Sequence, residues 1–153
     1  MKVTGEITIN APRAQVFERL RDARFFASCV DGVQDLVEVD ATHYTAVLET
    51  KVAYMTFRFN VTVEVTRIEA PSEIEAKVEG TPLGVVGRLT ARSLTRLSED
   101  GGATKVAYET ESTLAGKLGS IGQPVLRAKA KEMEKQFAKR LQAAFQAAPG
   151  ETQ

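Results

Sequence analysis

The feature that most constrains the fold is an uninterrupted helical pattern in the last helical run of the chain, Gly119 to Phe145. No glycine or proline occurs between Pro124 and Pro149, and most residues there are strong helix formers. The apolar residues recur at spacings of three and four: Leu126, Ala130, Met133, Phe137, Leu141 and Ala144. A helix of about seven turns with one apolar stripe is stable only when that stripe packs against a large surface. Because the upstream chain is strand-like, the pattern predicts that this surface is a sheet.

The strands are predicted from alternation of apolar and polar residues. Met55 to Val65 is the clearest case, with an apolar residue at every second position. Two short helices are expected between the first and second strands, the first opening at Asn10-Ala11-Pro12. Short turns between the later strands favour antiparallel pairing. The seven predicted strands are Lys2–Asn10, Leu36–Val39, Tyr44–Val52, Met55–Val65, Ile74–Val78, Leu89–Leu97 and Thr104–Leu114.

The order of elements predicts an α+β fold of the helix-grip type. In this arrangement a curved seven-stranded antiparallel sheet wraps around one long C-terminal helix, and two short helices follow the first strand. A length of 153 residues suits one domain, expected over residues 1–146, with a disordered tail at 147–153.

Composition excludes several classes of protein. Twenty basic and twenty acidic residues give no overall charge that would indicate nucleic-acid binding. The single cysteine, Cys29, cannot form an internal disulfide. No apolar stretch is long enough to cross a bilayer, and the N-terminus has no signal-peptide core. A soluble, cytoplasmic protein is expected.

The residues that commonly carry catalysis are scarce. The only histidine, His43, is predicted at a surface turn, and Cys29 lies among apolar neighbours. The sequence suggests no metal site, and Gly84-Val85-Val86-Gly87 lacks the lysine and following helix of a phosphate loop. No inward-facing acid–base pair is evident. We therefore expect a protein that is not an enzyme.

Several motifs resemble one family. Gly5-Glu6, Ala11-Pro12 and Val16-Phe17 are similar to the start of the carbon monoxide dehydrogenase G-subunit proteins, in the START-like (SRPBCC) superfamily. Cys29 to Val33 resembles that family's cysteine–x–proline–glycine element, with Asp31 in place of proline. Gly116 to Gly122 is similar to its signature before the C-terminal helix. Leu20 and Asp22 also match, and the resemblance extends from residue 1 to about 145.

The resemblance implies a non-catalytic role beside a molybdenum carbon monoxide dehydrogenase. Proteins of this family are associated with placing that enzyme at the membrane and with its electron acceptor, a quinone. The implied partners are that enzyme, an isoprenoid quinone such as menaquinone, and the inner face of the cell membrane. The quinone is a bound ligand, and no covalent cofactor is expected.

The aromatic, sulfur-bearing and aliphatic residues are the candidate ligand-binding residues. They either fill a core or line an apolar cavity between the helix and the sheet. A flexible methionine would adapt to a chain-like ligand. The candidates are Phe26, Val30, Leu48, Tyr54, Met55, Phe57, Phe59, Val78, Leu83, Val86, Leu89, Ile121, Val125, Met133 and Phe137.

The C-terminal helix is also strongly basic. From Ala115 to Gln146 there are seven basic and two acidic residues, a net charge of +5. The pattern fits either a solvated helix face or a patch for anionic lipid or an acidic partner. The glycine-rich turn Gly80 to Gly87 is expected to form one lip of a cavity mouth, and Phe25 to Val30 the opposite lip. The candidate membrane or partner contacts are Leu83, Val85, Lys129, Lys131, Lys135, Lys139 and Arg140.

Four functions remain open from the sequence. The first is a carrier that extracts a quinone from the membrane and presents it to the dehydrogenase. The second is a membrane adaptor that needs no ligand. The third is an enzyme of the polyketide-cyclase branch, and the fourth is a chaperone-like binding module.

Overall fold

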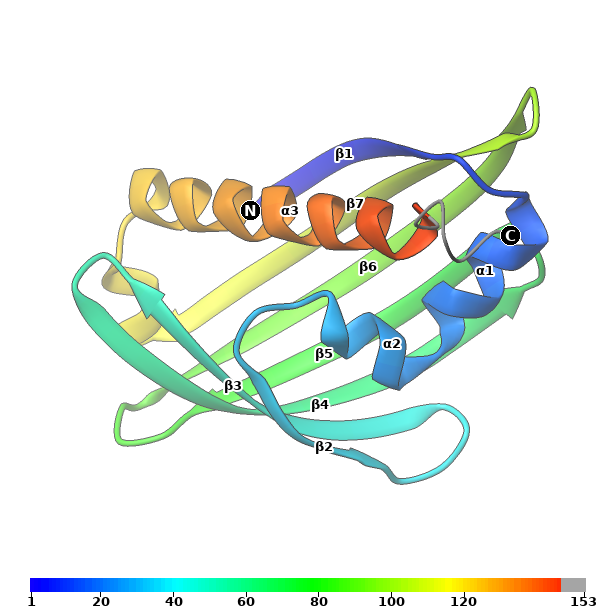
Figure 1. The fold of residues 1–153 in the computed structure, drawn as a ribbon. Coiled ribbons are helices and arrows are strands. Elements are labelled where there is room, and N and C mark those ends of the chain that lie inside the picture. Colours follow the sequence, from blue (N-terminus) through cyan, green and yellow to red (C-terminus); the bar gives the residue numbers. More distant parts are fainter. Residues whose placement is uncertain (147–153) are drawn as a thin grey trace.

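The computed structural model describes residues 1–146, so the predicted disordered tail, 147–153, lies outside the described residues. The chain forms seven strands, three α-helices and one short 3-10 helix (Figure 1). In chain order these are β1 (Lys2–Ile9), α1 (Arg13–Arg21), α2 (Ala23–Ser28), β2 (Val33–Glu38), β3 (His43–Val52), β4 (Met55–Glu69), β5 (Glu73–Pro82), β6 (Gly87–Asp100), β7 (Ala103–Gly116), η1 (Lys117–Ser120) and α3 (Gln123–Phe145).

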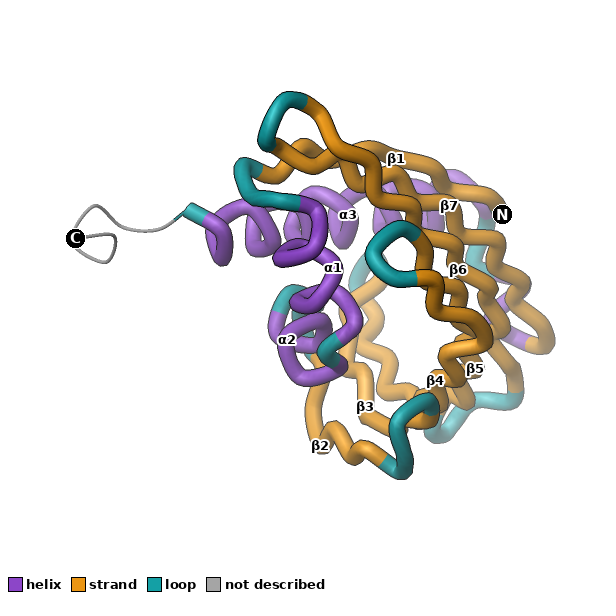
Figure 2. Tube along the Cα trace, turned by 90° about the vertical axis from the view of Figure 1, so that its right-hand side faces the viewer, coloured by secondary structure: helices purple, strands orange, loops and turns teal. Residues whose placement is uncertain are grey.

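All seven strands form one antiparallel sheet in the order β1-β7-β6-β5-β4-β3-β2. The sheet curves so that its edge strands, β1 and β2, both approach the helices: β1 lies beside α3, and β2 beside α2 (Figure 2). This arrangement confirms the predicted α+β helix-grip, START-like fold. None of the helices in residues 1–146 is long and apolar enough to cross a membrane.

The strands in the middle of the sheet are longer than their alternation predicts. The pattern ends β5 at Val78, but the strand extends to Pro82, because Gly80 continues the ladder opposite Val61 and Leu89. An added Cβ at Gly80 would make ordinary van der Waals contacts with Leu89 and Phe59, at 3.4 and 3.5 Å. The β5–β6 turn is therefore confined to residues 83–86.

The fully buried apolar residues form two separate groups. The α1 core lies where α1 and the C-terminal half of α3 meet the sheet, and the η1 core lies near the opposite end (Figure 1). The α1 core consists of Ile7, Ile9, Ala11, Val16, Phe17, Leu20, Leu97, Val106 and Leu141. The η1 core consists of Val52, Phe57, Phe59 and Leu118.

Helix α3 begins after Gly122, whose φ of 84° suits glycine, and Pro124 occupies its first turn. Only Leu141 of its predicted apolar stripe is fully buried. Ala144 is exposed. The remaining members of the stripe, Leu126, Ala130, Met133 and Phe137, are half-buried.

Candidate functional site

The inner face of the sheet, which faces α3, is only partly covered between the two cores. Residues at every second position of a strand, and their cross-strand partners, share one face of the sheet. Val63 lies on the same face of β4 as the buried Phe59. Its partners across the neighbouring strands are Val78 of β5, Ala91 of β6 and Ser112 of β7, which therefore share that face. Val63 and these three partners are neither buried nor fully exposed. Because protein interiors are normally close-packed, partly exposed residues on an inner wall mean that α3 does not cover this part of the sheet completely.

The two halves of this inner wall differ in chemistry. On β3 and β4 the inward residues are mainly aliphatic or aromatic, as at Leu48 and Val61. On β6 and β7, the inward residues between the two cores are small or carry hydroxyl groups. The inward hydroxyl residues are Ser93, Thr95, Thr110 and Ser112. The inner face beneath α3 thus has an apolar wall and a hydroxyl-bearing wall, as suits a ligand with a polar head and an apolar body.

A tyrosine and a glutamate meet above the hydroxyl-bearing wall. Tyr108 of β7 lies over Gly5 of β1, its register partner, where a Cβ would overlap the Tyr108 hydroxyl. The same Cβ would lie 2.7 Å from Oε1 of Glu134 on α3. Burial raises the pKa of Tyr108, and hydrogen bonding to Glu134 and the charge of its carboxylate raise it further. The Tyr108 hydroxyl therefore keeps its proton and donates a hydrogen bond to Glu134.

The predicted ligand-binding residues divide into three groups. Phe57 and Phe59 belong to the η1 core, with ring centroids 6.1 Å apart, and Leu48 and Ile121 pack against that core. Phe137 contacts Phe26 of α2, with ring centroids 5.0 Å apart. The half-buried residues Val30, Val78, Leu89 and Met133 complete this inward set. The aromatic residues thus mostly close the two ends of the space.

A third group is exposed and lies together at one end of the molecule. These residues come from the β3–β4 turn, the β5–β6 turn and the start of α3, which share the end marked by η1 (Figure 1). We call this group the apolar end: Tyr54 (87% exposed), Met55 (48%), Leu83 (49%), Val86 (80%) and Val125 (38%). Val85 is half-buried beside it. Exposed apolar side chains that gather at one end of a molecule indicate a contact surface rather than the lining of a ligand cavity.

An open groove of about 640 Å³ separates the β3–β4 turn from the first half of α3. Of the predicted site residues, only Val125 and Lys129 line it. The other lining residues are Lys51, Ala53, Pro124, Ala128 and Glu132. Phe57, Phe59, Met133 and Phe137 are not among them, so this groove is distinct from the predicted aromatic-walled pocket.

The predicted mouth is also arranged differently in the structure. Helix α2 packs against the C-terminal half of α3 through Phe26–Phe137 and Phe25–Phe145, away from the β5–β6 turn (Figure 1). Asp31, just beyond α2, pairs with Arg140 of α3 at 3.6 Å. Phe25 to Val30 and the β5–β6 turn therefore do not form opposite lips of one opening.

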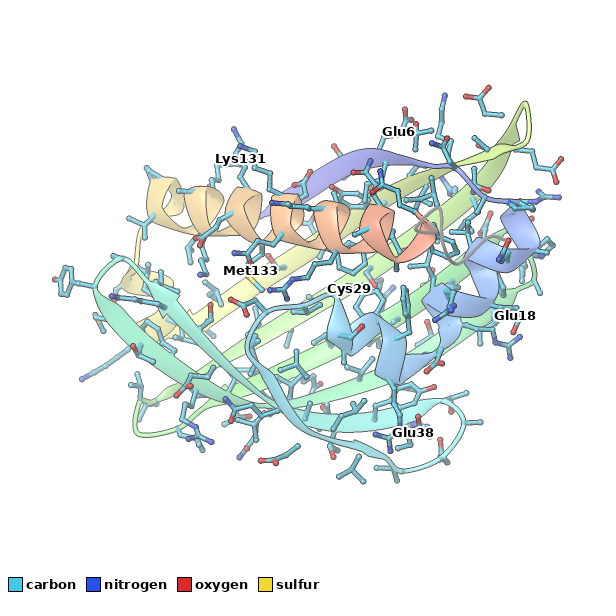
Figure 3. All side chains as sticks on the ribbon, in the orientation of Figure 1. Glu6, Glu18, Cys29, Glu38, Lys131 and Met133 are labelled. Carbon is cyan, nitrogen blue, oxygen red and sulfur yellow. The ribbon has the colours of Figure 1, made fainter. Side chains whose placement is uncertain are left out.

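The basic residues of α3 fall into two sets. Four exposed residues at four-residue spacing form an outward row, the basic stripe: Arg127, Lys131, Lys135 and Lys139. None of them joins an ion pair within residues 1–146. Figure 3 shows Lys131 and Met133 on opposite sides of the helix. Lys129 instead lies in the groove, with its side chain 19% exposed and paired with Glu132 at 3.4 Å, and Arg140 pairs with Asp31.

The remaining candidates for reactive residues, Cys29 and His43, have the surroundings of ordinary structural residues. Cys29 is buried, and this burial raises the pKa of its thiol. His43 is exposed and lies 2.9 Å from Asp40, whose pKa is lowered to about 2, first by the Thr42 backbone N–H and then by His43. Within residues 1–146, no group of three or more histidine, cysteine or acidic side chains is placed to hold a metal ion.

Tyr108 and Glu134 are the residues that sequence reasoning missed. A signal for both was present. Glu109 and Glu111 mark the wet face of β7, which places Tyr108 inward. Glu134 follows Ala130 by four residues and therefore lies beside the apolar stripe of the helix. What the pattern could not show is that the two side chains meet, because that depends on where α3 crosses β1 and β7.

Comparison with known proteins shows which family model and which solved structures the chain matches. The family model for the G subunit of carbon monoxide dehydrogenase (CoxG) matches residues 5–146. No curated protein sequence matches. A conserved protein from Geobacillus kaustophilus is 24% identical with a TM-score of 0.86, covering 95% of each chain. The ZhuI aromatase/cyclase from Streptomyces sp. R1128 is 15% identical (TM-score 0.68; 94% of this chain, 92% of that one). Ara h 8.0201 is 12% identical (TM-score 0.64; 95% and 97%).

Proposed function

Because the chain belongs to the carbon monoxide dehydrogenase G-subunit (CoxG) family, we propose that it is a non-catalytic carrier of an apolar ligand. The ligand is an isoprenoid quinone, with menaquinone as the first candidate, and the carrier brings it from the membrane to a molybdenum carbon monoxide dehydrogenase. It works at the inner face of the cell membrane. The observation that carries this proposal is the half-exposed inner wall between the two cores, beneath α3.

The two-sided chemistry of that wall supports a quinone. An isoprenoid quinone has a ring with two oxygen atoms and a long apolar chain. The serine and threonine hydroxyls of the wall on β6 and β7 can donate hydrogen bonds to the ring oxygens. The aliphatic wall on β3 and β4 can hold the chain, and Met133 can adjust to it.

A carrier should retain its ligand through purification. We expect an organic extract of the protein, purified from a bacterium that makes menaquinone, to contain menaquinone in a fixed ratio to protein. Mass spectrometry of the extract measures this directly. An unrelated protein of similar size, purified from the same cells, is the control. An extract that holds no more quinone than the control would overturn the carrier function.

The adaptor function has support of its own in the surface of the molecule. The basic stripe on α3 and the apolar end are both exposed, and together they suit an anionic membrane. Each basic residue close to such a membrane contributes about 1 kcal/mol, and the attraction weakens as salt screens it. A carrier that loads from the membrane needs the same surface, so the two functions differ only in whether a ligand is bound.

Charge reversal on the basic stripe tests this surface. We expect Lys135→Glu/Lys139→Glu to lower binding to anionic liposomes at low salt at least tenfold, since about 2 kcal/mol of attraction is lost. Sedimentation with vesicles containing phosphatidylglycerol measures it. The control is Lys77→Glu/Arg92→Glu, the same charge change at two exposed register partners on the outer face of the sheet. Equal losses in the two variants would mean that net charge, and not this stripe, governs binding.

The enzyme alternative rests on Tyr108 and Glu134, which we call the inward pair. Tyr108 and Glu134 are the kind of acid–base pair that a cyclase would need, and the sequence alone did not reveal it. A tyrosine whose pKa is raised releases its proton reluctantly. The pair is therefore better suited to holding a ligand than to transferring protons, which favours the carrier.

A further inference from the structure

The inward pair also specifies the chemistry of the group that it can hold. The Tyr108 hydroxyl and Oε1 of Glu134 both lie within 2.7 Å of the point where a Cβ on Gly5 would be, so the single hydroxyl proton of Tyr108 faces the Glu134 carboxylate. Both side chains are half-buried. What the pair then offers is hydrogen-bond acceptors: the Tyr108 oxygen and the Glu134 carboxylate oxygens. It has no spare proton to donate.

No cationic side chain near the pair in residues 1–146 supplies an additional donor to Glu134. No lysine, arginine or histidine forms an ion pair with Glu134 in the described part of the chain. The nearest inward residues in register are Thr95 and Thr110, whose hydroxyls can donate or accept. A half-buried carboxylate without a cationic partner is stabilised by further hydrogen-bond donors, since burial without partners is costly.

We propose that Tyr108 and Glu134 form a head-group site that prefers a ring hydroxyl to a ring carbonyl, so that the protein binds a hydroquinone more tightly than the corresponding quinone. A hydroquinone hydroxyl donates to the carboxylate, whereas a quinone carbonyl accepts only from the neighbouring Thr95 and Thr110 hydroxyls, which serve both forms alike, and gains nothing from the pair. The inference rests on the proposed quinone-binding function and refines it. Besides bringing the quinone to the dehydrogenase, the carrier would then also take up the reduced form, which a quinone-reducing partner releases.

The preference for the reduced form can also be measured as a change in reduction potential. Tighter binding of the reduced form raises the reduction potential of the bound couple, by about 30 mV for each tenfold difference in affinity for this two-electron pair. A redox titration of the loaded protein therefore reports the same quantity as two separate affinity measurements.

The test uses menaquinone with a single prenyl unit, either oxidised or reduced with dithionite under anaerobic conditions. Equilibrium dialysis with quantification by chromatography gives both dissociation constants. We expect the wild-type protein to bind the reduced form at least tenfold more tightly. Glu134→Gln should abolish or invert this preference, because the new amide can donate to a quinone carbonyl.

The matched control is Glu132→Gln, the same change on the same helix, at a residue whose partner is Lys129 in the groove. It should keep the wild-type preference, and thermal melts should show both variants folded. Equal wild-type affinities for the two forms would overturn the inference while leaving the carrier function intact. A preference that survives Glu134→Gln would also overturn it. If neither form binds the wild-type protein, the carrier function itself fails.

Discussion

Replacing Ala91 with phenylalanine is expected to reduce quinone binding at least hundredfold without lowering the free energy of unfolding. Ala91 is partly exposed on the inner face of strand β6, between Val78 and Ser112 in register. A phenyl ring there would occupy the space beneath α3 that the ligand needs. Because the ring fills space and buries apolar area, the fold should be as stable as before or more so. Urea unfolding and equilibrium dialysis with single-prenyl menaquinone measure the two effects.

The control for this change is Ala107→Phe. Ala107 is also half-exposed but lies on the outer face of the neighbouring strand β7, opposite Arg96 and Glu6. It should bind quinone like the wild type. A close-packed interior would give the opposite result, because over-packing a full core costs about 1–3 kcal/mol. Such a loss in Ala91→Phe would show that the space under α3 is already filled.

Truncating Leu141 to alanine is expected to destabilise the protein by about 2–5 kcal/mol, the range for large-to-small changes in a core. Leu141 is the only fully buried residue of α3, and it joins the helix to the α1 core. Met133→Ala, two turns earlier, should cost less than about 1 kcal/mol, since Met133 is half-buried over the open inner wall. Urea unfolding monitored by circular dichroism compares the two variants.

The contrast between these two variants tests how α3 is held. A helix anchored at its C-terminal half and roofing a space in its middle should depend on Leu141 far more than on Met133. Equal costs would mean that α3 packs along its whole length. In that case the half-exposed inner wall could not receive a ligand without the helix moving.

Most of the fold could be predicted from local patterns. The period of two along Met55 to Val65, and the spacing of three and four along the last helix, are both present in the structure as β4 and α3. Errors were confined to element ends. At Gly80, for example, pairing with Val61 and Leu89 continues a strand that composition alone would end. These patterns depend only on the polarity of each residue and its place in the chain, so they can be recognised from the sequence alone.

The candidate site was predictable only in part. Their aromatic side chains put Phe57, Phe59 and Tyr54 in the same candidate set, but the structure buries the first two in the η1 core and leaves Tyr54 87% exposed. Likewise, Lys129 and Lys135 look equivalent in the sequence. One lines the groove beside Glu132, and the other belongs to the outward stripe.

The sequence by itself determined which residues are strand or helix, which face of each strand is wet, and which family the chain resembles. Only the tertiary structure decided which inward residues fill a core, which border a space, and that Tyr108 meets Glu134 over Gly5. The reason is physical. Polarity and spacing are properties of neighbouring residues, whereas burial and contact depend on the path of α3 across a curved sheet, which the whole chain sets at once.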